Sequence, residues 1–232
     1  MKMGTIALLA ISMGGLFALA AAARHVLSQK PGSTGPAPSS PEEDATLGTL
    51  PQVPHLLERE AKEPGFVREF LRVIKETGAD GDRYAALMSE ESGFRPDIKN
   101  PIGAVGLMQW LPSITHLVGY TAAEIGAMTA IEQMRGPVKA TMKLQGVAGR
   151  KDPAMAGWGS HVGEPDATVI ATKEPPFPPP ANSARFYTDN KGYDRDNKGY
   201  ITAGDVRKAV YGLLDGAALK PRIGPNGKPV TA

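Results

Sequence analysis

The sequence predicts a mainly α-helical protein, and three observations support this fold class. Apolar residues recur at intervals of three and four in several stretches after residue 65, and glycine or proline ends most of these stretches. The chain has no cysteine, which excludes a small disulfide-built scaffold. Its 232 residues are enough for one sizeable domain or two small ones.

The charge balance excludes some classes of partner and site. Lys and Arg number 26 and Asp and Glu number 24, so the formal net charge is +2. Nucleic-acid-binding domains usually carry a clear basic excess, so we expect no nucleic acid as a partner. Without cysteine, thiolate zinc sites and cysteine nucleophiles are impossible, and the four histidines are scattered and form no HExxH pair.

The N-terminus predicts a membrane segment. Residues 4–23 contain no charged side chain, and about 20 apolar residues span the hydrocarbon core of a bilayer. We therefore expect a transmembrane helix or signal anchor within residues 1–27. A cleaved secretory signal is the alternative, because Lys2 precedes the run and Ala21-x-Ala23 resembles a cleavage site.

A flexible linker is predicted over residues 28–52. This segment is rich in Pro, Gly and Ser and has few large apolar side chains. It cannot bury enough surface to offset the entropy lost on ordering. The linker would let the domain that follows, residues 53–180, reach away from the membrane.

Two helices are predicted at the start of that domain. The first lies between Pro64 and Gly78, and its core-facing residues are Phe66, Val67, Phe70, Leu71, Val73 and Ile74. The second is capped by Asp82, runs to about Ser92 and stops at Gly93.

The later part of the domain mixes helices with loops. Helical spacing recurs in residues 112–118 and 122–144. Between residues 149 and 180 the pattern gives way to Gly, Pro and single charges, and residues 167–171 alone have strand character. The proline run at 175–180 is expected to be a rigid spacer.

The second predicted helix carries a carboxylate on its apolar face. This face is formed by residues three and four apart, namely Tyr84, Leu87, Met88 and Glu91, whereas Glu90 is turned about 100° away. A carboxyl group at the edge of a core loses hydration, which raises its pKa toward the range useful for donating a proton. Glu91 is therefore the candidate catalytic acid; the alternative is an ordinary last-turn residue that points to solvent.

The loop GAVGLMQW at residues 103–110 is the second candidate element. Gly103 and Gly106 remove side chains and let a ligand approach the backbone. Gln109 supplies an amide donor and acceptor of the kind that meets the N-acetyl and hydroxyl groups of a sugar. A core role is the alternative for Leu107, Met108 and Trp110.

Together these segments resemble a known enzyme family. Residues 91–113, ESGFRPDIKNPIGAVGLMQWLPS, are similar to the glutamate-serine and GLMQ motifs of the lytic transglycosylases, goose-type-lysozyme-like enzymes that cut peptidoglycan, in the family's order and spacing. Residues 119–142, GYTAAEIGAMTAIEQMRGPVKATM, look most like members carried by bacteriophages. The resemblance covers about residues 66–172 and implies a lysozyme-like helical domain.

The resemblance implies a role for each matching residue. Glu91 would be the single acid and then base at the glycosidic bond between N-acetylmuramic acid and N-acetylglucosamine. The muramic 6-hydroxyl would then attack its own anomeric carbon and give a 1,6-anhydro product, without any cofactor. Ser92 would orient the reacting group, and the substrate cleft would be lined by Gly106, Leu107, Met108 and Gln109.

Hydrolysis, the reaction of a muramidase, is the alternative outcome. Glycoside hydrolysis ordinarily uses two carboxylates at a defined separation. The residues that could supply the second carboxylate are Asp97, Asp152, Glu164 and Asp166. The sequence does not give their distances from Glu91.

One motif of the family is missing. Many members carry an Ala-Tyr-Asn segment whose tyrosine helps to hold the catalytic glutamate, and this chain has no clear copy of it. The corresponding region, residues 151–171, offers Trp158 and His161 as substrate-cleft candidates. A structural role is the alternative for Trp158.

Residues 181–232 are predicted to form an EF-hand-like helix-loop-helix and a tail. The pentapeptide DNKGY occurs twice, and the second copy fits a calcium loop over residues 194–205, with candidate ligands Asp194, Asp196, Tyr200, Thr202 and Asp205. Lys198 stands where an oxygen ligand is expected. The alternative to bound Ca²⁺ is therefore a metal-free loop in which the Lys198 ammonium replaces the cation.

These expectations combine into a membrane-anchored lytic transglycosylase that faces the periplasm or cell wall, with a virion membrane or tail as a further location. Its expected partners are bacterial peptidoglycan, the membrane through the N-terminal helix, and other virion or envelope proteins. Two alternatives remain: a non-catalytic structural or glycan-binding protein that keeps the lysozyme-like fold, and a calcium-responsive adaptor.

Overall fold

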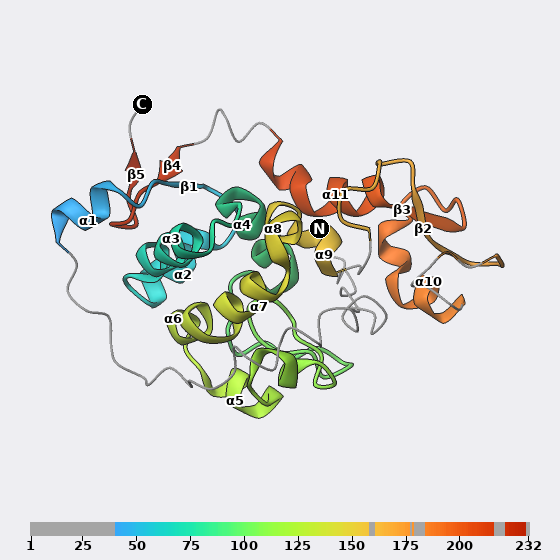
Figure 1. The fold of residues 1–232 in the computed structure, drawn as a ribbon, viewed down its shortest axis with the longest axis horizontal. Helices are drawn as coiled ribbons and strands as arrows, with labels where there is room; N and C mark the ends of the chain where they lie inside the picture. Colours follow the sequence, from blue (N-terminus) through green and yellow to red (C-terminus); the bar gives the residue numbers. More distant parts are fainter. Residues whose placement is uncertain (1–39, 158–160, 177, 179–183, 216–220, 231–232) are drawn as a thin grey trace.

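The computed structural model describes most of the chain after the predicted membrane segment (Figure 1), namely residues 40–157, 161–176, 178, 184–215 and 221–230. The predicted membrane segment at 1–27, the first part of the predicted linker and Trp158 lie outside the described residues. Within these described ranges, no helix is long and apolar enough to cross a bilayer.

The described chain is mainly helical, which confirms the predicted class. The α-helices are α1 (Pro41–Ala45), α2 (Leu56–Lys62), α3 (Phe66–Thr77), α4 (Gly81–Ser92), α5 (Ala122–Ala127), α6 (Ala130–Gln133), α7 (Lys139–Leu144), α8 (Gly146–Lys151), α9 (Pro153–Gly157), α10 (Ala184–Asn190) and α11 (Ala203–Tyr211). Shorter helical turns are η2 (Thr115–Val118), η3 (Met134–Val138), η4 (Lys191–Tyr193) and η5 (Gly212–Leu214).

The strands are short and form two small antiparallel sheets. They are β1 (Leu50–Pro51), β2 (Val169–Thr172), β3 (Tyr200–Thr202), β4 (Arg222–Ile223) and β5 (Pro229–Val230). One sheet has the order β1-β4-β5, with Leu50 opposite Ile223, and the other pairs β2 with β3. Each sheet therefore joins segments that are far apart in the sequence.

Helix α4, which carries the two glutamates, starts earlier than the sequence suggests. Its N-cap is Asp80, whose carboxylate accepts a hydrogen bond from the Arg83 backbone N–H at 3.1 Å, so Asp82 lies inside the helix. Gly93 ends α4 in the left-handed conformation, with φ of 57°. Both ends of the helix are therefore held by local chemistry, which fixes where its last turn lies.

The predicted helix at 122–144 is broken into shorter pieces. Thr121 and Thr129 each begin a new helix, and each forms a reciprocal capping box, with Glu124 and Glu132 respectively. Pro137 then interrupts the regular hydrogen bonds, and the chain makes a π-helical turn, η3. Apolar spacing alone did not reveal where the new helices begin, because a capping residue within the segment leaves the apolar periodicity nearly unchanged.

The end of the predicted linker is ordered, which differs from the expectation of a tether to residue 52. The Ser40 side chain caps α1 by accepting a hydrogen bond from the Glu43 backbone N–H. Leu47 and Leu50 are buried. Two isolated leucines among small residues have no periodicity, so their burial against the rest of the chain was not visible in the sequence.

The residues on either side of the predicted boundary at 180 share structural elements. Strand β2 comes from the predicted transglycosylase domain and β3 from the predicted C-terminal unit, yet they pair with each other. Helix α11 packs against α4 and α9. Figure 1 shows α10, β2 and β3 gathered at one end of the molecule, with α11 running from there to the helical body.

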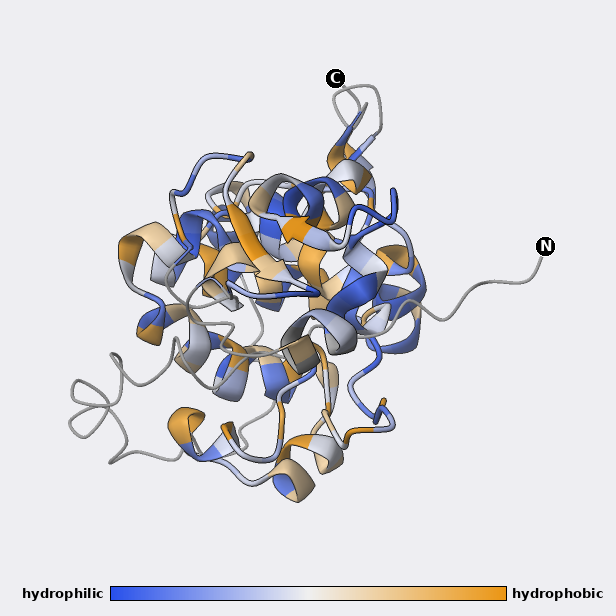
Figure 2. Cartoon of the chain, turned by 90° about the vertical axis from the view of Figure 1, so that its right-hand side faces the viewer, coloured by the Kyte–Doolittle hydropathy of each residue, from blue (hydrophilic) through white to orange (hydrophobic). Residues whose placement is uncertain are grey.

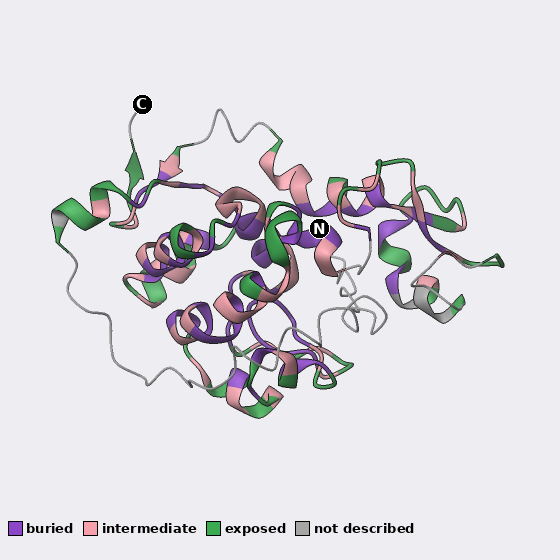
Figure 3. Cartoon of the chain, in the orientation of Figure 1, coloured by how far each residue is buried: buried purple, intermediate pink, exposed green. Residues whose placement is uncertain are grey.

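The hydrophobic core draws many of its buried residues from α3, α4 and α9, and Figure 3 shows buried residues concentrated inside the helical body. Hydrophobic and hydrophilic residues alternate around the helices in Figure 2, as expected of helices with one buried face. The fully buried aromatic residues of the core are Phe66, Phe70, Tyr84 and Phe94. This packing buries the middle of α4, from Tyr84 to Ser89.

Candidate active site

A pocket with a cavity volume of about 60 Å³ lies beside the C-terminal half of α4. Its lining residues are Leu87, Glu91, Met108, Trp110, Ile114, Leu117, Val118, Thr141, Leu144, Gln145, Pro153, Ala156 and Gly157. They come from α4, the loop at 103–111, η2, α7 and α9. Among these described lining residues, Glu91 alone carries an acidic group.

The environment of Glu91 favours its protonated form. Burial raises the pKa of Glu91 well above its usual range, and the negative charge of the neighbouring Glu90 raises it further. A carboxyl group that keeps its proton near neutral pH can act as a general acid. Glu91 and Met108 line the same pocket, so α4 and the glycine-rich loop meet at the candidate acid.

Glu90 is also withdrawn from water, which the helical wheel did not suggest. Its Oε1 atom is buried and has no hydrogen-bond partner among the described residues. Burial raises the pKa of Glu90, while the positive charge of Arg195 opposes this shift. The C-terminal segment that carries Arg195 therefore lies near enough to Glu90 for their charges to interact.

Tyr193 is a site residue that sequence reasoning did not identify. It is buried, and its pKa is raised well above the usual range by burial and then by the charges of Glu91 and Glu90. Its turn, η4, packs against α11, which in turn packs against α4. Tyr193 ends the first DNKGY copy, to which the sequence assigned no role, because only the second copy fits the calcium-loop pattern.

Ser92 connects the helix to the loop and does not line the pocket. Its side chain is buried, and its hydroxyl lies 3.1 Å from the Met88 carbonyl oxygen and 2.9 Å from that of Leu107. This hydroxyl therefore holds the end of α4 against the GLMQ loop. These two contacts of the Ser92 hydroxyl help to fix the position of Glu91 relative to Met108.

Gly106 is required for close packing within the protein. Its φ is +77°, and a Cβ atom there would lie 2.6 Å from Oε1 of Gln133 and 2.9 Å from the Ile125 side chain. The same Gln133 oxygen accepts a hydrogen bond from the Leu107 backbone N–H at 2.8 Å. Gln133, which the sequence analysis did not single out, thus holds this loop from behind.

The amide of Gln109, expected to face the substrate, is used within the loop. Gln109 is 1% exposed. Its Nε2 donates to the Gly106 carbonyl at 3.0 Å, and its Oε1 accepts from Nδ2 of Asn100 at 3.0 Å. Of the four GLMQ residues, Met108 alone belongs to the described pocket lining, while Gly106, Leu107 and Gln109 support it.

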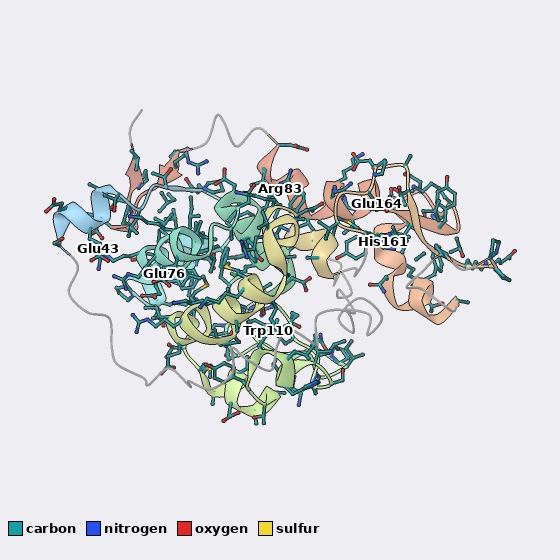
Figure 4. The ribbon with its side chains drawn as sticks, in the orientation of Figure 1. Glu43, Glu76, Arg83, Trp110, His161 and Glu164 are labelled. Atoms are coloured by element: carbon teal, nitrogen blue, oxygen red, sulfur yellow. The ribbon has the colours of Figure 1, made fainter. Side chains whose placement is uncertain are left out.

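The other predicted substrate-cleft residues lie elsewhere. His161 is buried but is not among the pocket-lining residues, and Trp158 lies outside the described residues. Figure 4 shows Trp110 within the helical body and His161 and Glu164 toward the β2–β3 end. Trp110 forms part of the pocket wall, and its Nε1 donates a hydrogen bond to the Thr141 hydroxyl at 3.0 Å.

The candidate second carboxylates do not line the pocket. Asp152 accepts hydrogen bonds from Arg207 at 3.0 Å and from the Tyr211 hydroxyl at 2.8 Å. Arg207 also binds Asp166 at 2.7 Å. Asp97 is exposed, and Glu164 lies within reach of the Thr168 hydroxyl.

The EF-hand-like loop is organised around the Lys198 ammonium. This ammonium donates to both carboxylate oxygens of Asp205 at 2.9 Å. Asp194 accepts hydrogen bonds from the backbone N–H groups of Lys198 and Gly199 at 2.8 Å and from the Tyr187 hydroxyl at 2.7 Å. This is the arrangement of the metal-free alternative.

The remaining candidate calcium ligands are exposed or are engaged at the start of a helix. Asp196 and Tyr200 are exposed, and Thr202 caps α11 together with Asp205. Across the described part of the chain, no group of three or more His, Asp or Glu residues is arranged to hold a metal ion. The charges of both glutamates act on Tyr193, and the charge of Arg195 acts on Glu90; Tyr193 and Arg195 immediately flank Asp194.

One comparison with known proteins finds a family match over the segment that carries the candidate acid. Residues 73–142 match the family model of the transglycosylase SLT domain, a segment that contains Glu91, Ser92 and the GLMQ loop. No curated protein matches the chain well enough to be called a relative. Members of the SLT family degrade peptidoglycan and need no cofactor for catalysis. Over residues 73–142 the chain therefore matches a transglycosylase SLT domain, and this match supports lytic transglycosylase activity on peptidoglycan.

Proposed function

We propose that Glu91 is the acid and then the base in cleavage of the bond between N-acetylmuramic acid and N-acetylglucosamine. The observation that carries this proposal is the position of Glu91, a carboxyl group with a raised pKa in a mostly apolar pocket. Withdrawal from water keeps the proton on the carboxyl group until a glycosidic oxygen accepts it.

The proposed reaction has two steps. First, the Glu91 proton moves to the glycosidic oxygen, and the bond from this oxygen to the muramic anomeric carbon breaks. Second, the Glu91 carboxylate takes the proton of the muramic 6-hydroxyl, and that oxygen forms a bond with the anomeric carbon. The products are a free N-acetylglucosamine hydroxyl and a 1,6-anhydromuramic end, and no water is consumed.

The lack of a second acidic residue in the described pocket lining supports this internal attack over hydrolysis. A retaining or inverting hydrolase needs a second carboxylate about 5 to 9.5 Å from the acid. The acidic candidates Asp152 and Asp166 are instead bound by Arg207. A single acid that first gives and then takes a proton suits the anhydro-forming reaction.

The proposal is tested by incubating isolated sacculi with the protein and measuring the soluble muropeptides released. Glu91→Gln keeps the shape of the side chain and removes its proton, and we expect release to fall at least a hundredfold, the scale of general acid–base catalysis. Glu174→Gln is the matched control, because Glu174 is exposed and is not among the pocket-lining residues. Equal release by wild type and Glu91→Gln would overturn the assignment.

The same experiment separates the enzyme from a non-catalytic protein with a lysozyme-like fold. That second function is motivated by the missing Ala-Tyr-Asn segment. A wild-type protein that sediments with sacculi but releases no fragments would support it. Release that depends on Glu91 would exclude it.

We further propose that residues 1–27 anchor the enzyme to a membrane, facing the periplasm or cell wall, with association to other envelope or virion proteins. The uncharged run at 4–23 supports the anchor. Full-length chain should remain in the membrane fraction after alkaline extraction, whereas a chain that begins at residue 40 should not. Recovery of both in the soluble fraction would contradict the anchor.

A further inference from the structure

Gln145 is a pocket residue outside both family motifs. It follows α7, lines the same pocket as Glu91 and is partly buried. Its Oε1 accepts a hydrogen bond from the hydroxyl of Tyr84, a fully buried residue of α4. The carbonyl end of the Gln145 amide is therefore directed at α4.

The Gln145 Nε2 group makes no hydrogen bond to any residue that the structure describes. Other polar groups near the pocket, in contrast, already have hydrogen-bond partners within the protein. The Thr141 hydroxyl accepts from Trp110 and donates to the Pro137 carbonyl at 2.8 Å. The Gln109 amide is used within its own loop. Gln145 thus offers an unused N–H donor at the pocket wall.

The backbone at Gln145 is held by close packing. Gly149 in α8 leaves room for the turn after α7, because a Cβ atom there would lie 2.8 Å from Cβ of Gln145 and 3.2 Å from that of Ala156. Tyr84 fixes one end of the amide and Gly149 permits the approach of the backbone. The N–H donor is therefore preorganised, which lowers the cost of binding.

We propose that the Gln145 amide donates a hydrogen bond to the acetamido carbonyl oxygen of the sugar bound beside Glu91. This inference rests on the proposed function of the site. An acetamido group combines an oxygen that only accepts hydrogen bonds with a methyl group. The pocket combines one free donor with apolar walls formed by Leu87, Trp110, Ile114, Leu117, Val118 and Leu144. Gln145 is in this account a specificity residue that recognises N-acetylated sugars.

The test compares wild type with Gln145→Ala and Gln145→Glu on normal peptidoglycan and on peptidoglycan from which the acetyl groups have been removed. Loss of a buried hydrogen bond should lower kcat/KM on the acetylated substrate about tenfold or more, mainly through KM. The two variants and wild type should cut the deacetylated substrate at similar rates. Lys143→Ala, an exposed residue of α7, is the control.

Two further variants probe the preorganisation. Tyr84→Phe frees the Gln145 carbonyl oxygen, and Gly149→Ala forces Gln145 to move, so both should reproduce part of the loss on acetylated substrate. Thermal melting of every variant shows whether the fold is kept. An equal loss on acetylated and deacetylated substrate for Gln145→Ala would overturn the inference.

A binding measurement separates this inference from the proposed reaction. Calorimetry with an N-acetylglucosamine oligomer and the Glu91→Gln variant requires no cleavage. We expect the additional Gln145→Ala change to weaken binding about tenfold, and expect no such difference with the deacetylated oligomer. If wild type cuts nothing but this dependence is found, the proposed function fails and the Gln145 assignment stands; unchanged oligomer binding overturns the assignment.

Discussion

The Ser92 hydroxyl lies 2.9 Å from the Leu107 carbonyl oxygen and joins the last turn of α4 to the loop that carries Met108. Both bonded groups are buried, so the contact is shielded from water. Since Glu91 immediately precedes Ser92, this contact helps to fix the distance between the candidate acid and the loop. The two residues of the glutamate-serine pair thus have different roles: Glu91 lines the pocket, and Ser92 joins α4 to the loop.

Ser92→Ala should therefore reduce both stability and activity. Removing the hydroxyl leaves the Leu107 carbonyl without this partner, at a cost of about 1–3 kcal/mol in the free energy of unfolding. Denaturant unfolding measures the first effect, and kcat with sacculi measures the second. Ser113→Ala, at an exposed position, is the control. Unchanged stability in Ser92→Ala would show that the contact contributes little.

Glu90→Gln should move the pH profile of the enzyme. The charge of Glu90 raises the pKa of Glu91, so its removal lowers that pKa. Activity requires protonated Glu91 and is lost as pH rises through its pKa. The alkaline limb of kcat/KM should therefore shift to lower pH in Glu90→Gln. A shift to higher pH, or none, would contradict the electrostatic coupling of the two glutamates.

Tyr193→Phe isolates the effect of the phenol hydroxyl near the two glutamates. The phenyl ring keeps the packing of this buried residue, so the melting temperature should change little. Loss of a polar neighbour leaves the Glu91 carboxylate less well solvated, which raises the pKa of Glu91. The alkaline limb should move to higher pH, opposite to the shift in Glu90→Gln. Identical profiles for wild type and Tyr193→Phe would remove Tyr193 from the site.

Glu91→Gln should stabilise the fold at alkaline pH. The pKa of Glu91 is raised in the folded state, so ionisation of this group costs stability as pH rises above the unfolded-state pKa. Glutamine cannot ionise and avoids this cost. The melting temperature of Glu91→Gln should exceed that of wild type at pH 8, and the two should converge near pH 4. A lower melting temperature at pH 8 would indicate that the Glu91 charge is well accommodated.

Lys198 should determine the response of the C-terminal loop to calcium. Because its ammonium binds Asp205 in the metal-free arrangement, the melting temperature of wild type should be the same in excess chelator and in millimolar calcium. Lys198→Asp removes the ammonium and supplies an oxygen ligand at the fifth loop position. Its melting temperature should rise with calcium. A calcium-dependent shift in wild type would contradict the role assigned to Lys198.

Local features of the fold were predictable from the sequence, whereas contacts between distant segments were not. The buried face of α3 and the last turn of α4 follow from apolar spacing and from Gly78 and Gly93, which lie next to the residues they affect. The candidate acid Glu91 was identified in the same way. The restart of the helix at Thr129 and the burial of Leu50 depend on caps and on pairing partners that periodicity does not report.

The contacts of the residues that support the site were likewise not predictable from the sequence. Gln109 has the chemistry of a substrate-binding amide, but its partners Asn100 and Gly106 become evident only once the loop is folded. Gln145 lies on the pocket through the turn after α7, and Tyr193 reaches α4 from more than one hundred residues away in the chain. A residue type predicts what a side chain can do, and only the fold determines what it faces.

In the proposed reaction, one carboxyl group at position 91 cleaves the glycan strand without water. Digestion of sacculi in water enriched in oxygen-18, followed by mass spectrometry of the fragments, tests this claim most directly. We expect 1,6-anhydromuropeptides that carry no heavy oxygen from wild type, and no fragments from Glu91→Gln. Reducing-end muropeptides that contain oxygen-18 would show hydrolysis and contradict the account.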